Sequence, residues 1–398
     1  MNQLAKLVLV TGSGRSSEIG DQVFNILRDT YKLGDKVDLI KSVPYDALDE
    51  DQKGIRDRTR PLVIDRFKDS EVRVEVGKDV LLRRLRGTHV AFLKYLFDPD
   101  EGGIHVNRHL FEVYAFGRFL NKHLKRRGDL EHLTLVSPYL TYLRMHSVDK
   151  YIENDDFYQA NTLELNIDIL DMVCGIDSIL TMDPHSDDVK KYCETMGMDF
   201  QGHNPFSSSR YTNFAKLGFE KEGDARNTLN ALQPFINYFE NHKEEYKDAI
   251  VIAPDDGSEN RSEHFVVDTG LSFKNLAYMN KKRIEAGDVK LSRFKYFSAI
   301  KEEDVKGRVC ILTDDMVASG NTAEKVAEYL HKLGAERVEL WVTHAVCPEM
   351  GKIEELKYVN KIISLDSIIR ENDKIIQVPA TAQILSAQIY KNYHKGAS

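Results

Sequence analysis

Hydrophobic positions along the chain form short, nearly continuous runs that alternate with amphipathic stretches. The runs rich in β-branched residues lie at 5–13, 88–96, 132–140, 177–185, 248–256, 309–316 and 337–346. Stretches between them, such as 17–31, carry apolar residues at helical spacing. Buried parallel strands have continuous apolar runs because helices cover both faces of their sheet. The pattern therefore predicts an α/β fold with two parallel sheets.

Polar segments predict where the domains divide. Residues 201–213, QGHNPFSSSRYTN, combine Gly, Pro and a run of serines, which is typical of a boundary. A length of 398 residues also favours two domains. We expect an N-terminal domain over 1–203, with a charged insertion at about 34–61, and a C-terminal domain over 204–398. Charged residues 281–306 are expected to form a mobile loop.

Composition narrows the class of protein. The net charge is −8, and the 55 Lys and Arg residues are dispersed among 63 acidic ones, which argues against nucleic acid as a partner. The N-terminus does not resemble a signal peptide, and no apolar run approaches the ~18 residues of a membrane span. The four cysteines are far apart, which is typical of reduced core thiols. We expect a soluble cytoplasmic protein with no membrane partner.

The segment from Arg308, RVCILTDDMVASGNTA, carries the strongest chemical signal. An apolar run ends in Asp314 and Asp315, and a small loop then leads to a helix expected to begin near Thr322. The N–H groups of a helix N-terminus favour an anion, and Ser319 and Thr322 add hydroxyl donors. The carboxylates can accept hydrogen bonds from neighbouring hydroxyls. The loop suits a ribose phosphate, whereas the alternative is an ordinary capped strand–loop–helix junction.

The stretch ILTDDMVASGNTA resembles the ribose-5-phosphate loop shared by phosphoribosyltransferases and phosphoribosyl-diphosphate (PRPP) synthetases. The resemblance implies that Asp314 and Asp315 bind the ribose hydroxyls and that the loop that follows binds the ribose phosphate. The loop residues are Ala318, Ser319, Gly320, Asn321 and Thr322. Ala318 replaces an aspartate common in the synthetases, and Asn321 replaces a glycine. Asparagine tolerates positive φ, so the turn is expected to survive.

Further segments resemble the synthetases rather than the transferases. In RFKDSEVRVEV, Phe67, Asp69 and Glu71 match residues that surround the adenine of ATP. Their alternate spacing would place all three on one side of an extended segment, and the alternative is an edge strand with alternating charge. In SPYLTYLRMHSVDK, Arg144 and Asp149 match ATP contacts, although Met145 and His146 replace the usual Gln and Asp. An arginine fork suits a polyphosphate.

Three short motifs resemble the catalytic centre of the synthetases. ILTMDPHSDD makes His185 a candidate magnesium ligand, and VIAPDDGSENR makes Asp255 its partner. In NKKR, Lys281 and Arg283 match the two cations that stabilise the transferred phosphoryl group. The alternatives are a structural histidine and a solvated basic cluster.

The resemblance covers most of the chain from about Phe67, and the chain is identified as a divergent member of the ribose-phosphate diphosphokinase (PRPP synthetase) family. This implies two doubly wound domains of the phosphoribosyltransferase type, ATP as co-substrate, Mg²⁺ and a homo-oligomer. The implied reaction moves the β,γ-diphosphate of ATP to the C1 hydroxyl of ribose 5-phosphate, giving PRPP and AMP for nucleotide biosynthesis. No Walker loop is present, so ATP would not be held as in P-loop enzymes.

Three alternatives stay open. The acceptor could be a larger 5-substituted ribose such as ADP-ribose, which would connect the protein to NAD metabolism. The chain could be a phosphoribosyltransferase, which would not need the ATP-site residues. It could also be a non-catalytic relative that regulates a synthetase.

Overall fold

The computed structural model describes residues 6–53, 58–98, 106–144, 160–186, 188–203, 233–285, 288–295 and 298–395. The chain divides into two compact units, one of residues 1–203 together with 381–398, and one of residues 204–380. The C-terminal helix α14 (Thr381–Lys395) therefore belongs to the first unit, whereas the sequence predicted a second domain that includes all residues after 203.

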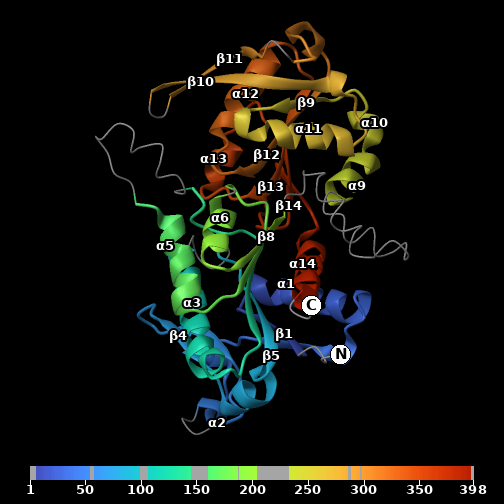
Figure 1. The fold of residues 1–398 in the computed structure, drawn as a ribbon. Coiled ribbons are helices and arrows are strands. Elements are labelled where there is room, and N and C mark those ends of the chain that lie inside the picture. Colours follow the sequence, from blue (N-terminus) through green and yellow to red (C-terminus); the bar gives the residue numbers. More distant parts are fainter. Residues whose placement is uncertain are drawn as a thin grey trace. The chain divides into compact units, whose positions relative to one another are not determined.

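The first unit is built on a parallel six-stranded sheet with the order β2-β1-β5-β6-β7-β8 (Figure 1). Its strands are β1 (Lys6–Thr11), β2 (Val37–Lys41), β5 (Thr88–Leu93), β6 (His132–Ser137), β7 (Ser178–Met182) and β8 (Asp199–His203). Its α-helices are α1 (Arg15–Asn25), α2 (Glu50–Lys53), α3 (Val106–His123), α5 (Thr162–Asp168), α6 (Asp188–Thr195) and α14.

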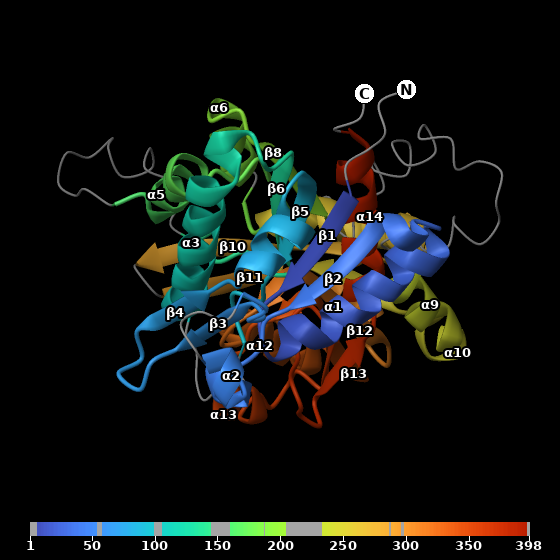
Figure 2. The same cartoon turned by 90° about the horizontal axis from the view of Figure 1, so that it is seen from below.

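Helices cover both faces of this sheet, with α3, α5 and α6 on one side and α1 and α14 on the other (Figure 2). Alternate strand residues such as Val8, Val90 and Leu133 enter the core beneath α3, while their neighbours, such as Leu9, are buried on the opposite face. Because side chains on both faces are buried, the strands have continuous apolar runs, as predicted.

A separate antiparallel hairpin, β3 (Val63–Arg66) and β4 (Val72–Glu75), belongs to the first unit. Its strands follow the charged stretch 34–61, whose described residues contribute β2, the short helix α2 and two further helical turns.

The second unit contains a seven-stranded sheet in the order β11-β10-β9-β12-β13-β14-β15, parallel except for β11. Its strands are β9 (Ile250–Ala253), β10 (Leu276–Glu285), β11 (Asp288–Phe294), β12 (Val309–Val317), β13 (Arg337–Ala345), β14 (Lys361–Leu365) and β15 (Ile375–Val378). Its helices are α9 (Gln233–Asn241), α10 (Lys243–Tyr246), α11 (Glu259–Asp268), α12 (Asn321–Lys332) and α13 (Met350–Glu354).

Two different cores cover the faces of this second sheet. Val338, Leu340 and Val342 of β13 enter an aliphatic core with residues of α12. Trp341 points to the other face, where its ring lies 5.2 Å from that of Phe265 in α11. The α/β prediction with two doubly wound sheets is thus confirmed.

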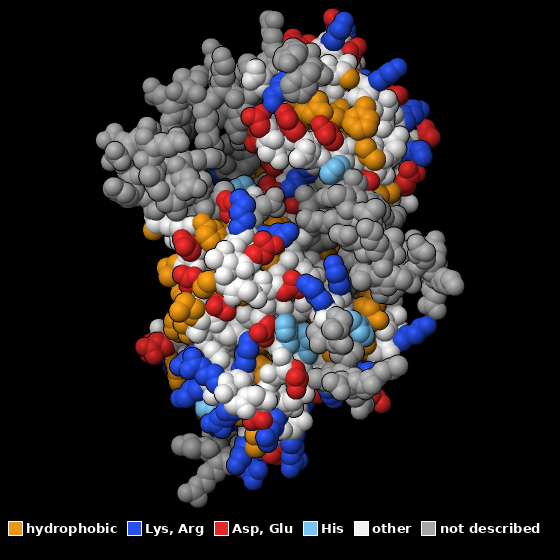
Figure 3. Space-filling model, in the orientation of Figure 1, with side chains coloured by type: hydrophobic (Ala, Val, Ile, Leu, Met, Phe, Trp, Pro, Cys, Tyr) orange, Lys and Arg blue, Asp and Glu red, His pale blue; other side chains and the backbone are white. Residues whose placement is uncertain are grey.

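Other sequence expectations meet the structure as follows. Cys174, Cys193, Cys310 and Cys347 are buried and free, and burial raises the pKa of each thiol, to about 12 for Cys310. Over the part of the chain that the structure describes, no helix has the length and apolarity needed to cross a bilayer. On the face drawn in Figure 3, Lys and Arg side chains are interspersed with Asp and Glu.

Candidate functional site

Three predicted carboxylates lie where the strand order of the second sheet reverses. The chain runs from β9 through α11 to β10 on one side, and from β12 through α12 to β13 on the other. The two neighbouring strands β9 and β12 therefore diverge, and ligands of α/β sheets bind beyond the carboxyl ends of such strands. Asp255 follows β9, and Asp314 and Asp315 end the core of β12. The topology brings these three residues to one edge of the sheet.

The electrostatics confirm that the carboxylates are close neighbours. Burial, together with the charges of Asp315 and Asp255, raises the pKa of Asp314 well above its usual range, and Arg261 of α11 opposes the rise. Asp315 is 8% exposed, and its Oδ1 accepts the N–H of Met316 (2.8 Å). Oδ1 of Asp314 accepts the N–H of Asp315 (2.9 Å). Hydrogen-bond donors or a cation placed here would stabilise the ionised carboxylates.

The predicted anion loop connects β12 to α12. Ala318 and Ser319 form a bend, and Gly320 adopts a left-handed conformation with φ 75° as the N-cap of α12. The helix begins at Asn321, one residue before the position expected, and Thr322 lies in its first turn. Asn321 has helical backbone angles. The positive φ that was expected at this position occurs at Gly320 instead. The N–H of Asn321 lies 3.5 Å from Ser319 Oγ.

Helix α11 joins the Asp255 loop to the strand that carries Asp314. The backbone N–H of Asp255 donates to Ser258 Oγ (3.1 Å), which itself lies 3.2 Å from Oδ1 of Asp255. One turn later, Ser262 Oγ lies 2.7 Å from Thr313 Oγ1. Ser262 and Thr313 are both fully buried. Helix α11 thus contacts both strand ends, at Asp255 through Ser258 and at Thr313, the residue before Asp314, through Ser262.

Lys281 and Arg283 lie in a paired strand, not in an irregular loop. Both belong to β10, where Lys281 pairs with Leu291 and Arg283 with Val289 of β11. The expectation of a loop over 281–306 is therefore wrong for its first part, because residues 279–285 and 288–294 form an antiparallel ribbon.

The predicted adenine-site residues meet at the tip of the β3–β4 hairpin. The N–H of Phe67 donates to Glu71 O (2.8 Å), and the N–H of Glu71 to Asp69 Oδ1 (3.2 Å). Ser70 has a φ of 73°, so the expected extended segment is wrong and a tight turn takes its place. Phe67 is 45% exposed, and the Arg73 guanidinium lies 4.6 Å from its ring centroid.

Two further predicted residues follow neighbouring strands of the first sheet. Arg144 lies in an exposed turn after β6, and His185 is exposed just after β7. Since β6 and β7 are parallel neighbours, both residues lie at the carboxyl edge of that sheet. Asp149 lies outside the described residues.

The chemistry of the second-unit carboxylates fits magnesium. Mg²⁺ is usually bound by one or two carboxylates together with water and substrate phosphates. Burial, followed by the charges of Asp315 and Asp255, raises the pKa of Asp314, and a cation at this position would stabilise its ionised form. Within the described ranges, no group of three or more His, Cys, Asp or Glu side chains is arranged to hold a metal ion by itself.

Sequence reasoning missed several residues that organise this site. Lys295, Glu259 and Tyr278 connect the β10–β11 ribbon to α11, and Ser262 and Thr313 connect α11 to β12. The sequence shows them only as polar residues within amphipathic or charged stretches, because the contacts join residues at least 15 positions apart.

Comparisons with known proteins agree with this geometry. Residues 230–383 match the phosphoribosyl transferase domain. The chain is 27% identical over 281 residues to the ribose-phosphate pyrophosphokinase of Haemophilus influenzae, covering 71% of this chain and 70% of the relative. It is 25% identical over 327 residues to that of Vibrio cholerae, covering 82% of this chain and 84% of the relative.

A solved structure shares the fold over the whole length. The phosphoribosylpyrophosphate synthetase from Mycobacterium smegmatis superposes with a TM-score of 0.64 at 18% identity, covering 98% of this chain and 99% of that one. The matched domain, the curated relatives and this shared fold together support a divergent member of the ribose-phosphate diphosphokinase family of enzymes.

Proposed function

We propose that the protein transfers the β,γ-diphosphate of ATP to the anomeric C1 hydroxyl of ribose 5-phosphate, giving PRPP and AMP. The observation that carries the proposal is the group of Asp255, Asp314 and Asp315 at the strand reversal of the second sheet, beside the Gly320 cap of α12. In this proposal the ribose hydroxyls donate to Asp314 and Asp315. The 5-phosphate accepts hydrogen bonds from the N–H groups at the start of α12, with Ser319 and Thr322.

The remaining predicted residues have roles on the ATP side. Phe67, Asp69 and Glu71 would bind adenine, and Arg144 and Asp149 would contact ATP elsewhere, Arg144 at the phosphates. His185 and Asp255 are each proposed as Mg²⁺ ligands, and the ion would supply positive charge to the phosphate oxygens. Lys281 and Arg283 would stabilise the negative charge that develops on the transferred group, since phosphoryl transfer depends mainly on positioning and electrostatics.

Asn321 favours a second candidate acceptor. Its exposed side chain adds an amide at the first residue of α12, where the family loop usually has a glycine. An acceptor whose 5-phosphate bears a further substituent, such as ADP-ribose, would use this amide. The reaction would be the same diphosphoryl transfer.

The decisive experiment measures AMP release from ATP and Mg²⁺ with either ribose 5-phosphate or ADP-ribose. We expect release with ribose 5-phosphate. AMP release with ADP-ribose but not with ribose 5-phosphate would show that the second candidate is the acceptor. Failure to bind ATP would favour a phosphoribosyltransferase, and ATP binding without AMP release for either acceptor would favour a non-catalytic relative.

Lys281→Ala tests the proposed catalytic cation. Because the lysine would act on charge that develops in the transition state, kcat should fall by about 10²–10³-fold with KM changed by less than about threefold. Steady-state kinetics with the accepted ribose measure both constants. Near-normal kcat would remove Lys281 from the mechanism.

A further inference from the structure

The ribbon that carries Lys281 and Arg283 is attached to its sheet over a short length. β10 pairs with β9 only at Leu276, Ala277 and Tyr278. Beyond Met279 it pairs with β11 alone, across two register irregularities. A two-stranded ribbon without further support is marginally stable in water. At its base, Met279 and Phe294 pack in the aliphatic core of the unit, and polar side chains add further attachments.

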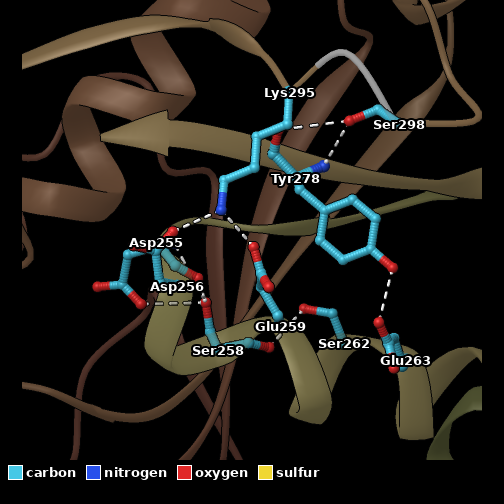
Figure 4. Close-up of polar contacts among 9 residues, drawn as sticks. All are labelled: Asp255, Asp256, Ser258, Glu259, Ser262, Glu263, Tyr278, Lys295 and Ser298. Carbon is cyan, nitrogen blue, oxygen red and sulfur yellow. Dashed lines mark hydrogen bonds and ion pairs between the residues drawn. The ribbon is translucent and has the colours of Figure 1, made fainter. Parts of the chain in front are cut away.

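Two side chains at the base of the ribbon reach the same helix (Figure 4). Lys295 lies directly after β11. Its Nζ is 2.5 Å from Oδ1 of Asp256, in the turn before α11, and 2.5 Å from Oε1 of Glu259, the first residue of α11. Tyr278 donates its hydroxyl to Glu263 Oε1 (2.8 Å), one turn further along α11. These five residues, Lys295, Tyr278, Asp256, Glu259 and Glu263, are called the α11 clamp below.

The backbone joins the two halves of the clamp. The N–H of Lys295 donates to Tyr278 O (2.8 Å), and the N–H of Tyr278 donates to Ser298 Oγ (3.1 Å). Two side-chain attachments one helical turn apart fix both the position and the direction of the ribbon, whereas a single attachment would let it pivot. The Lys295 side chain is only 18% exposed, so its ion pair is less screened by solvent than most surface pairs.

The helix that the clamp holds also positions the carboxylates. Asp256 is the neighbour of Asp255, and Ser258 binds the Asp255 backbone. Ser262 of α11 reaches Thr313, which directly precedes Asp314. One helix thus supports the ribbon on one side and both acidic strand ends on the other.

We propose that Lys295 and Tyr278 are positioning residues whose contacts with α11 set where Lys281 and Arg283 lie relative to Asp255 and Asp314. The role in catalysis rests on the proposed function, whereas the attachment of the ribbon does not. Lys295 and Tyr278 act through the catalytic cations and do not touch the reacting atoms.

The first test is kinetic and uses the full chain. Lys295→Met removes the charge, Tyr278→Phe removes one hydroxyl, and Lys332→Met is the control because it breaks an exposed pair with Glu328 (2.8 Å) in α12. We expect kcat to fall about tenfold in each clamp variant with KM for ATP changed less than about twofold, since small misplacements of catalytic groups act on kcat. Lys295→Arg should restore most of the activity, and Lys332→Met should match the wild type.

A double-mutant cycle separates positioning from general damage. If Lys295 acts through Lys281 and Arg283, adding Lys295→Met to a chain that already carries Lys281→Ala and Arg283→Ala should lower kcat by less than about twofold further. Independent, multiplicative losses would overturn the proposal.

The second test needs no enzymatic activity. Amide hydrogen exchange of the ribbon strands β10 and β11 should be at least about tenfold faster in Lys295→Met, and faster in Tyr278→Phe, than in the wild type or Lys332→Met. Unchanged exchange in both clamp variants would refute the clamp. If the wild-type protein releases no AMP, the proposed function is refuted instead. Hydrogen exchange then tests the attachment of the ribbon by itself.

Discussion

Single carboxylates of the second unit differ according to what surrounds them. Asp314 carries a raised pKa because Asp315 and Asp255 add negative charge to its burial. Asp268, at the end of α11, has its pKa raised to about 6 by burial alone, and within the described part of the chain its Oδ2 has no hydrogen-bond partner. A ligand could add hydrogen-bond donors or a cation beside Asp314. The buried carboxylate of Asp268 only lowers the stability of the fold.

Asp268→Asn tests this distinction. The pKa of Asp268 in the folded chain lies above its usual 3.8, so the folded state holds the proton more tightly, and the free energy of unfolding falls as pH rises from about 4 to about 6. Asparagine has no such proton. The variant should therefore gain stability across this window, reaching about 1 kcal/mol at pH 7 once solvent screening is allowed for.

Urea unfolding at pH 4, 5, 6 and 7 measures this gain. Asp373→Asn, at an exposed position of the same unit, is the matched control and should show no comparable rise. A stability difference that is constant from pH 4 to 7 would contradict the assignment.

At the scale of elements, the strand–loop–helix unit of β12 and α12 depends on one backbone conformation. Gly320 has φ 75°, and a β-carbon there would lie 2.9 Å from Leu356 Cδ1. The N–H groups that follow can point at an anion only if the chain turns at this residue. Helix α12 is further anchored where the carboxylate of Glu324 accepts the N–H groups of Tyr358 and Val359 (3.0 Å and 3.1 Å).

Gly320→Ala should lower the free energy of unfolding by about 1–2 kcal/mol, the cost of a left-handed conformation for a residue with a β-carbon. In the proposed function the loop binds the acceptor's phosphate, so the variant should also raise KM for the ribose acceptor by about tenfold or more. Denaturation and steady-state kinetics measure the two effects.

Gly307→Ala provides the matched control for this loop. Gly307 has φ 71°, and a β-carbon at this position would meet no atom of the described residues within 4 Å, so the substitution isolates the conformational cost. We expect a similar loss of stability with an unchanged KM. An equal change of KM in both variants would show that the effect does not come from the loop.

At the scale of the whole molecule, the first unit combines two segments of the chain that are far apart in the sequence. Helix α14 ends the sequence but packs in the first unit, where Gln388 donates to Thr181 O of β7 (2.9 Å) and Asn392 to Thr134 Oγ1 of β6 (2.9 Å). Tyr390 stacks on Tyr31 at 4.5 Å between ring centroids. The first unit is therefore complete only when the last residues of the chain are in place.

Leu385→Ala tests that dependence. Leu385 is fully buried in α14, so truncation should destabilise the first unit by about 2–5 kcal/mol. Amide exchange should accelerate in β5 and β6 and stay near the wild-type rate in β12. Leu330→Ala, equally buried in α12, should show the opposite pattern. Equal acceleration in both units for either variant would contradict the division.

Local patterns in the chain were enough to predict the parts of this protein that depend on short-range chemistry. Continuous apolar runs predicted the strands β1, β5, β6, β7, β9, β12 and β13, because side chains buried on both faces need no polar alternation. The pair Asp314–Asp315 before a glycine and a helix predicted the strand–loop–helix junction, with the start of its helix correct to within one residue. The charged edge segments were harder to predict: Phe67 to Glu71 form a turn, and Lys281 lies in a ribbon.

Which residues meet depends instead on the three-dimensional fold. Asp255 and Asp314 are neighbours because β9 and β12 pair although their sequences lie far apart, and α14 returns to the first unit after all of the second has been traced. Lys295 contacts Glu259, which lies 36 positions earlier in the sequence. Periodicity and propensity report the environment of each residue, whereas such contacts depend on strand order and helix packing, which the local pattern does not contain.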